Sequence, residues 1–441
     1  MKQNDTHNPD LKSWIDSAND PQTDFPIQNL PFGAFKSPKN FSPHLSVAIG
    51  NYAIDLTSIM LNNLLDVSQE IKTACTKGFL NQLMALGNEA SSELRQALSK
   101  ALRSDARKDI QEKLKHHLFE RSKIELLNPV RVGDFTDFYA SIYHATNVGT
   151  MLRPENPLLP NYKYVPIGYH GRASSIVISG RKIRRPNGQI NSDDVSEPKF
   201  MPSRRLDYEA EIGFFVGTST GFGQMIPIRE AETHIWGACV VNDWSARDIQ
   251  RWEYQPLGPF LSKSFATSIS PWVVTLEALS VFRTNAFVRG EGEPKPLPYL
   301  YSPENAQHGG LDITLEVLIR TNQMHKQNLQ PFQLSKGSFK DMYWTPAQML
   351  THHASNGCNF HTGDLFASGT VSGKTREETG SLLERAWRGE SPIELPTGEK
   401  RSFIEDGDEV IIKAYCEKDG VRRIGFGECT GIIIPPFRVS K

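Results

Sequence analysis

The chain has 441 residues, of which 38% are hydrophobic and 10% aromatic. This is enough to fill complete cores, and at about 150 residues per domain it predicts two or three domains. The 49 Lys and Arg against 50 Asp and Glu give a formal net charge of −1. Nucleic-acid binders usually carry a basic surplus or long basic runs, so we expect no nucleic-acid partner, although a local basic patch stays open.

The sequence predicts a cytoplasmic protein without a membrane partner. The polar first 20 residues hold no apolar stretch typical of a signal peptide, and the longest apolar segment, near residues 272–282, is far short of the ~20 residues that span a bilayer. The five cysteines are widely spaced, odd in number and lack a C-x-x-C pair. A disulfide framework or a zinc cage is therefore not expected.

The N-terminal part is predicted to be a small β unit followed by helix. Residues 1–23 are rich in Asn, Asp, Ser and Pro and are expected to form a loose polar leader. Residues 46–56 hold two short β-type stretches around a Gly-Asn pair, which indicates a hairpin. Over residues 80–118, leucines recur at i, i+4 and i+8, which predicts an amphipathic helix.

Beyond residue 129 the pattern returns to short strands separated by Gly and Pro. The β-like stretches are 175–180, 208–216, 238–242, 312–321 and 408–415. We therefore expect a mainly β protein with a polar leader, a smaller N-terminal domain and a larger domain, which cover residues 1–23, 24–129 and 130–441.

A pair of glutamates is the first candidate for chemistry. The two-residue period of a strand places Glu209 and Glu211 on one face. Two like charges held this close repel unless a cation or a shared proton compensates, so the face is either exposed to solvent or a metal site. Both interpretations stay open, because charge pairs are common on exposed strand edges.

A second acidic element lies at the end of an apolar strand. Asp243 is there either a metal ligand or the cap of the helical turn that follows. Arg247 and Gln250 follow at helical spacing and point to about the same side, so a carboxylate, a guanidinium and an amide converge. Lys263, among small and apolar residues, is either part of this site or a lysine that reaches the surface.

The segment 133–147 contributes further candidates. Asp137 is a fourth candidate oxygen ligand and Tyr139 a candidate substrate contact. His144 is a candidate general base, although most histidines are ordinary surface or core-edge residues. If the four carboxylates share one site, their oxygens select a hard cation, namely Ca²⁺, Mg²⁺ or Mn²⁺.

Other motifs are missing or uninformative. The sequence contains no G-x-S-x-G elbow, no phosphate-binding P-loop and no G-x-G-x-x-G after a strand, which argues against a serine hydrolase, a kinase or a dinucleotide enzyme. We expect no organic cofactor. The stretches 169–172 and 367–373 are turn-like and are predicted to be loops.

Several longer segments resemble the fumarylacetoacetase family in both residues and order. They are DFPIQNLP at 24–31, TDFY at 136–139, HATNVG at 144–149, PIGYHGRASS at 166–175, NDWSARDIQ at 242–250, GTVSG at 369–373 and DGDEV at 406–410. The resemblance covers nearly the whole chain after the leader. It implies an SH3-like β-barrel domain, a larger β-roll domain and a homodimer.

The resemblance also implies roles for individual residues. The implied Ca²⁺ ligands are Asp137, Glu209, Glu211 and Asp243, and the residues of an implied second, Mg²⁺-type site are Asp243, Lys263 and Thr267. His144 resembles the family's proton acceptor and Glu384 the carboxylate that orients it. The implied oxyanion group is Arg247, Gln250 and Lys263, and the implied substrate contacts are Tyr139, Arg153, Gln250, Tyr254 and Thr370. The sequence departs from the family pattern at Ser262 and Ala266, where glycines are common.

The implied activity is hydrolysis of the carbon–carbon bond of 4-fumarylacetoacetate to fumarate and acetoacetate, the last step of tyrosine and phenylalanine catabolism. One alternative is a hydrolase of a related 2,4-diketo acid. A second is a non-catalytic Ca²⁺-binding β-protein, against which the His, Arg and Lys near the acidic residues argue.

Overall fold

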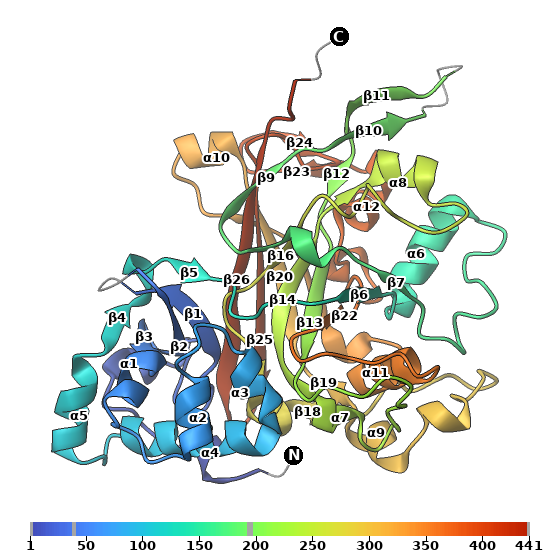
Figure 1. The fold of residues 1–441 in the computed structure, drawn as a ribbon. Coiled ribbons are helices and arrows are strands. Elements are labelled where there is room, and N and C mark those ends of the chain that lie inside the picture. Colours follow the sequence, from blue (N-terminus) through green and yellow to red (C-terminus); the bar gives the residue numbers. More distant parts are fainter. Residues whose placement is uncertain (1–2, 38–40, 192–196, 439–441) are drawn as a thin grey trace.

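The computed structural model describes residues 3–37, 41–191 and 197–438. Figure 1 shows a smaller N-terminal unit, in blue and cyan, beside a larger unit dominated by long strands. The prediction of a mainly β protein is confirmed. Within the described residues, no helix combines the length and the apolar character needed to cross a membrane.

The N-terminal unit is a five-stranded antiparallel sheet in the order β4-β3-β2-β1-β5, with helices packed against it. Its strands are β1 (Phe32–Lys36), β2 (Pro43–Ile49), β3 (Tyr52–Asp55), β4 (Leu118–Glu120) and β5 (Leu126–Leu127). The predicted hairpin is confirmed, because β2 and β3 pair around a turn at Gly50, whose φ of 53° suits glycine.

The prediction of a single helix over residues 80–118 is wrong, because the segment is divided into shorter helices. The segment forms three helices after α1 (Leu56–Leu61) and α2 (Gln69–Ala74): α3 (Asn81–Ala85), α4 (Gly87–Leu102) and α5 (Lys108–Lys115). Gly87 has a φ of 82° and allows the turn between α3 and α4. The amphipathic pattern itself is confirmed, since Leu94, Leu98 and Leu102 are fully buried on α4.

The prediction of a loose leader is also wrong for the described residues. Ile15 and Ala18 are buried, and the Ser13 hydroxyl donates to the Leu102 carbonyl oxygen at 2.8 Å. Asn4 caps a short turn at Asp5–His7. The polar residues on which the prediction of a loose leader rested instead make turns and bond to the backbone of α4.

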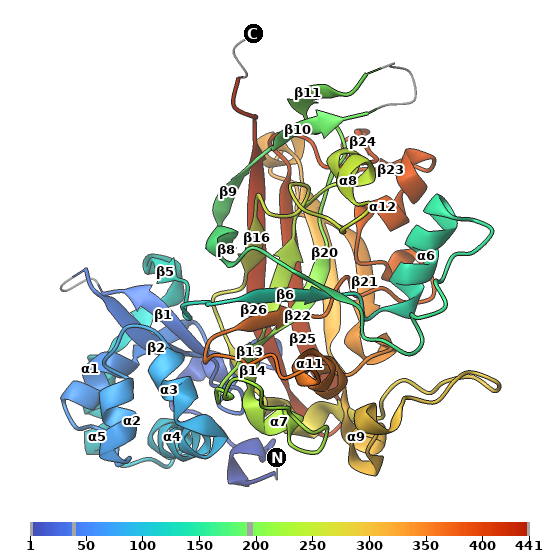
Figure 2. The same cartoon turned by 45° about the vertical axis from the view of Figure 1, so that its right-hand side comes forward.

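The larger unit is built on two sheets, seen from two directions in Figures 1 and 2. An eight-stranded sheet runs in the order β7-β6-β22-β13-β14-β16-β8, with β17 also paired to β14, and a five-stranded sheet runs β21-β20-β25-β26-β9. The strands of the first are β6 (Phe135–Phe138), β7 (Gly168–His170), β8 (Ile176–Ile178), β13 (Ala210–Val216), β14 (Ile235–Asp243), β16 (Thr267–Ile269), β17 (Val274–Thr275) and β22 (Leu365–Ala367). Those of the second are β9 (Arg181–Arg184), β20 (Thr314–Arg320), β21 (Phe332–Ser338), β25 (Glu409–Lys418) and β26 (Val421–Ile434). Each of the five predicted β stretches overlaps one of these strands, namely β8, β13, β14, β20 or β25.

Short paired strands and helices complete this unit. The remaining strands are β10 (Asn187–Ile190), β11 (Lys199–Pro202), β12 (Leu206–Asp207), β15 (Ser245–Ala246), β18 (Arg283–Thr284), β19 (Gly310–Leu311), β23 (Ile393–Glu394) and β24 (Lys400–Arg401). The helices are α6 (Ile142–Leu152), α7 (Ala231–His234), α8 (Arg247–Glu253), α9 (Pro303–His308), α10 (Asn322–Lys326), α11 (Pro346–Ala354) and α12 (Leu382–Arg385). In both views α6, α8 and α12 lie on the same side of the sheets.

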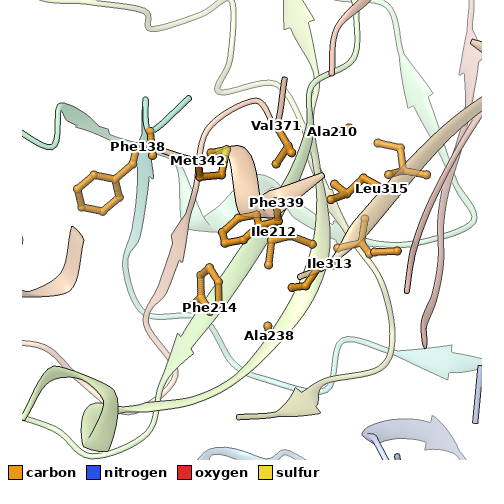
Figure 3. Packing of buried hydrophobic residues seen from close by; sticks show 14 of the residues in the cluster. Phe138, Ala210, Ile212, Phe214, Ala238, Ile313, Leu315, Phe339, Met342 and Val371 are labelled. Carbon is orange, nitrogen blue, oxygen red and sulfur yellow. The ribbon is translucent and has the colours of Figure 1, made fainter. Parts of the chain in front are cut away.

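The central strand β13 separates two hydrophobic layers. On one face Ala210, Ile212 and Phe214 pack into the main core with residues such as Phe339 (Figure 3). On the other face Phe215 belongs to a second core that includes residues of the N-terminal unit. Glu211 alternates with Ala210 and Ile212, so its side chain leaves the strand on the face opposite the main core.

Candidate active site and metal centre

Four carboxylates in or next to strands of the eight-stranded sheet meet in one buried cluster. Asp137 lies in β6, Glu209 precedes β13, Glu211 lies in β13 and Asp243 ends β14. Each offers a carboxylate oxygen within 4.8 Å of the others, and all four residues are buried. The interpretation as an exposed strand edge is therefore wrong. The capping interpretation of Asp243 is also wrong, because α8 begins after Ala246.

The cluster has the properties of a cation site. Among the described residues, both oxygens of Glu211 and Oδ1 of Asp137 lack a hydrogen-bond partner, although they are buried. Burial, and then the charges of Asp137, Asp243 and Glu209, raise the pKa of Glu211 well above its ordinary value. Buried carboxylate oxygens without partners are costly unless a proton or a metal compensates. An all-oxygen donor set fits Ca²⁺, Mg²⁺ or Mn²⁺.

Lys263 is part of this cluster and does not reach the surface. Its ammonium group binds a Glu209 oxygen and lies 2.8 Å from Asp243 Oδ2, while the Thr267 hydroxyl donates to Asp243 Oδ1 at 2.7 Å. Burial opposes the charge of Lys263, but Asp243 and Glu209 outweigh burial and raise its pKa above the ordinary value. The three residues of the predicted Mg²⁺-type site are thus adjacent. A charged ammonium has no lone pair for a metal, so that site stays a prediction.

Arg247 is held by two carboxylates. Its Nε donates to Asp207 Oδ2 at 2.9 Å and its Nη1 donates to Glu209 Oε1 at 2.6 Å. Nη1 also lies 3.2 Å from Gln250 Oε1, which confirms the predicted proximity of these two residues. Nη2 is buried and has no partner among the described residues. Two carboxylates thus hold the guanidinium and leave one of its nitrogens without an acceptor among the described residues.

His144 on α6 faces Glu384 on α12. Nδ1 of His144 lies 2.7 Å from Glu384 Oε2, and Glu384 also accepts hydrogen bonds from Asn147, Ser381 and Ser372. Burial opposes the charge of Glu384, but His144 and these donors together lower its pKa below the ordinary value. An ionised Glu384 requires the proton on Nδ1, which leaves Nε2 of His144 as the basic nitrogen.

A cavity of about 610 Å³ opens beside these groups, and its wall includes His144, Glu209, Arg247 and Lys263. The five predicted substrate contacts all line the same cavity: Tyr139, Arg153, Gln250, Tyr254 and Thr370. Glu211, Asp243, Thr267 and Glu384 are not part of its wall. The structure therefore brings the predicted residues together, with some on the surface of the cavity and others behind it.

Sequence reasoning missed two residues of the site, Tyr169 and Asp207. Tyr169, expected in a loop, lies in β7, and its hydroxyl is 2.9 Å from Asp137 Oδ2 and 2.8 Å from Asp243 Oδ2. No local pattern signals these contacts, because they depend on the pairing of β7 with β6. Asp207 was missed too, although the two-residue period that groups Glu209 with Glu211 extends back to it.

Comparisons with known proteins agree with this arrangement. The family model described as fumarylacetoacetate hydrolase C-terminal matches residues 135–433, and the one described as fumarylacetoacetase N-terminal matches residues 28–129. The chain belongs to the fumarylacetoacetase family. The two matches meet near residue 129, where we expect the domain boundary; the division into domains remains a proposal.

Relatives within the fumarylacetoacetase family match almost end to end. The fumarylacetoacetase of Rattus norvegicus is 46% identical over 429 residues, which cover 96% of this chain and 99% of the relative. That of Homo sapiens is 46% identical over 434 residues, covering 97% and 100%. That of Arabidopsis thaliana is 44% identical over 431 residues, covering 96% and 99%.

A solved structure, fumarylacetoacetate hydrolase from psychrophilic Exiguobacterium antarcticum, shares the fold. Its TM-score is 0.50 at 16% sequence identity, and the match covers 92% of this chain and 99% of that chain.

Proposed function

We propose that the protein hydrolyses 4-fumarylacetoacetate to fumarate and acetoacetate, the last step of tyrosine and phenylalanine catabolism. The observation that carries the proposal is the sequence identity of 44 to 46%, over almost the full length of the chain, to fumarylacetoacetases of animals and a plant. A histidine–glutamate pair and a buried acidic cluster beside one cavity supply groups suited to this chemistry.

Hydrolysis of this bond requires an activated water. We assign this step to His144, which takes the proton of the water at Nε2 while Glu384 holds the proton on Nδ1. The 2.7 Å contact between the two side chains supports the assignment, as does the place of His144 on the cavity wall. Glu384 orients the imidazole and stabilises its positive charge after the transfer.

The attacked carbonyl develops a negative oxygen that needs donors. We assign this role to Arg247, Gln250 and Lys263, all on the cavity wall. The unpartnered Nη2 of Arg247 is one such donor. A well-placed donor lowers the barrier by about 3 kcal/mol. Arg153 suits a carboxylate of the substrate, because its planar guanidinium can bind both oxygens. Tyr139, Tyr254 and Thr370 line the same wall as further substrate contacts.

The four clustered carboxylates would hold Ca²⁺, Mg²⁺ or Mn²⁺. A bound cation supplies Lewis-acid polarisation of the diketone oxygens and stabilises the enolate of the departing acetoacetate. Charge balance supports a divalent ion. When ionised, the four carboxylates carry −4 and Asp207, which shares Arg247, adds −1, whereas Lys263 and Arg247 supply +2, so the group is anionic without a cation.

Further parts of the proposal rest on the family resemblance. They are a homodimer and a second Mg²⁺-type site at Asp243, Lys263 and Thr267, whereas the proposed cytoplasmic location rests on the sequence analysis. The exposed apolar side chains of Leu257, which is 96% accessible, Phe260 and Leu261 support an interface between two copies, because such groups cost free energy in water.

The test is an assay of the purified protein with 4-fumarylacetoacetate, in which loss of the diketone absorbance and release of both products are followed. We expect turnover that stops with a chelator and returns with Ca²⁺, Mg²⁺ or Mn²⁺. The control variant His144→Ala should lose at least about 100-fold in kcat and keep its metal affinity, because the imidazole lies outside the cluster of ligands. Absence of turnover with every divalent ion contradicts the proposal. If 4-fumarylacetoacetate is not cleaved but another 2,4-diketo acid is, the protein is a hydrolase of that acid instead.

A further inference from the structure

Asp207 is a buried carboxylate that contacts Arg247, a residue of the cavity wall, without lining the cavity itself. It is 0% exposed, ends the short strand β12 and is not part of the cavity wall. It is not one of the four clustered carboxylates, and both of its oxygens accept from donors of this chain. Its position therefore calls for a role other than binding substrate or metal.

One side of Asp207 holds the oxyanion donor proposed above. Oδ2 accepts a hydrogen bond from Arg247 Nε at 2.9 Å, while Glu209 binds Nη1 of the same guanidinium. Two fixed acceptors on two nitrogens determine the plane and rotation of the group. The third nitrogen, Nη2, is consequently fixed in place without a partner of its own among the described residues.

Two other contacts of Asp207 hold the segment that carries Glu384, and its Oδ1 also accepts from the Tyr208 backbone N–H at 2.9 Å. Oδ1 accepts from the Leu382 backbone N–H at 2.9 Å and Oδ2 from that of Leu383 at 3.0 Å. These are the first two residues of α12, and the next residue is Glu384, which binds His144. A single carboxylate thus bonds directly to Arg247 and to the two amides that precede Glu384.

We propose that Asp207 is a positioning residue that keeps the Arg247 guanidinium and the Glu384–His144 pair in fixed relation to each other. The inference rests on the proposed function. Attack by water requires the base on one side of the carbonyl and the oxyanion donor on another, at separations that tolerate little error. A buried carboxylate with ionic and backbone donors is a rigid link between them.

A merely structural carboxylate would be equally buried and bonded, and the chain offers such a control. Asp408 is 1% exposed, accepts from Arg401 Nε at 2.8 Å and from the Glu405 backbone N–H at 2.9 Å, and is not part of the cavity wall. Asp207→Asn and Asp408→Asn therefore remove the same kind of contact, one beside the site and one away from it.

The test compares the steady-state kinetics, the melting temperature and the Ca²⁺ affinity of the two variants in the full chain. For Asp207→Asn we expect kcat to fall by about 100-fold or more, with KM and the calorimetric Ca²⁺ dissociation constant within about threefold of wild type. For Asp408→Asn we expect a similar loss of melting temperature with kcat within about twofold. In the double variant with Asp207→Asn and Glu384→Gln, kcat should fall by less than the product of the two single effects, because both substitutions disturb the Glu384–His144 pair.

A kcat for Asp207→Asn no lower than that of Asp408→Asn overturns the inference, and so does a loss confined to KM or to Ca²⁺ affinity. If Asp207→Asn does not fold, Asp207→Glu decides, since it keeps the charge and displaces it by one methylene. A lowered kcat at unchanged KM supports the inference, and an unchanged kcat overturns it. If the wild-type protein shows no turnover, both the proposed function and this inference are refuted. If the wild type is active and Asp207→Asn is equally active, only this inference is overturned.

Discussion

Glu211 is the residue at which burial and charge conflict most directly. It is fully buried, and neither of its oxygens has a partner among the described residues. Its pKa is raised by burial first and by the neighbouring carboxylates second. Below its ordinary pKa of 4.5 the group is neutral in the folded and unfolded chains alike. As pH rises, the unfolded chain ionises first, so the metal-free fold loses stability.

We predict that Glu211→Gln stabilises the metal-free protein increasingly as pH rises. In chelator, the melting temperature of the variant should approach that of wild type at about pH 4, below the ordinary pKa, and exceed it by about 2 to 4 °C at pH 8. Added Ca²⁺ should raise the melting temperature of wild type and change that of the variant little, because the variant lacks one of the four proposed anionic ligands.

Glu277→Gln is the matched control. Glu277 is also buried, but its carboxylate accepts from Asn4 and Ser92, so this variant should keep the Ca²⁺ response. A Glu211→Gln variant whose difference from wild type is the same at every pH, or whose Ca²⁺ response is intact, would contradict the account of this carboxylate.

Residue types and spacing predicted the chemistry of the site but not its burial. The spacing of Glu209 and Glu211 fits an exposed edge as well as a metal ligand, and Asp243 fits a helix cap as well as a strand end. What separates these interpretations is tertiary pairing, such as that of β13 with β14, which opposes Ala210 to Asn242. The resemblance to a family supplied what local patterns could not.

At the scale of elements, the N-terminal leader joins the two units. Asn4 Nδ2 donates to Glu277 Oε1 at 2.5 Å, and a ring nitrogen of His7 lies 2.8 Å from the Glu277 carbonyl oxygen. On the other side, Arg95 of α4 donates to the Thr6 hydroxyl at 3.0 Å. Residues 4–7 therefore bridge α4 and the segment after β17.

Removal of residues 1–8 should destabilise the protein without impairing its chemistry. At about 1 kcal/mol per hydrogen bond lost, we expect the free energy of unfolding in urea to fall by about 2 to 4 kcal/mol, with kcat within about twofold of wild type. Asp10→Ala, at an exposed leader position, is the control and should change neither quantity. Unchanged stability of the truncated protein would show that the bridge contributes nothing.

Local elements were the most predictable part of the fold. Strand alternation located each of the main predicted strands, and leucine spacing located the buried face of α4. The leader was mispredicted because composition alone does not distinguish polar residues in solvent from polar residues that bond to a neighbouring helix. Its partners lie far along the chain, as Glu277 does.

At the scale of the whole molecule, the two units share a hydrophobic layer. Phe215, Trp236 and Val241 of the eight-stranded sheet belong to the same core as Leu45 and Ile54 of the N-terminal sheet. The rings of Phe32 and Trp236 lie with their centroids 5.3 Å apart. Phe32 and Val273 also exchange two backbone hydrogen bonds of 2.9 and 2.7 Å.

This shared layer predicts one cooperative unfolding transition for the whole chain. Tryptophan fluorescence and far-ultraviolet circular dichroism should report the same urea midpoint within error, because opening either unit exposes the apolar surface of the other. An N-terminal unit that melted first, as an earlier transition in one of the two signals, would contradict the prediction.

The shared layer also constrains how the sequence can vary. Because Phe32 and Trp236 fill adjoining space, a change in the size of one ring requires a compensating change in the other, although they lie in different units. In a chimaera of the N-terminal unit of one relative and the larger unit of another, the two halves of the shared core would not be matched in shape and would pack poorly. Core residues on the two sides of this layer therefore have to change together during evolution, although they lie in separate segments of the sequence.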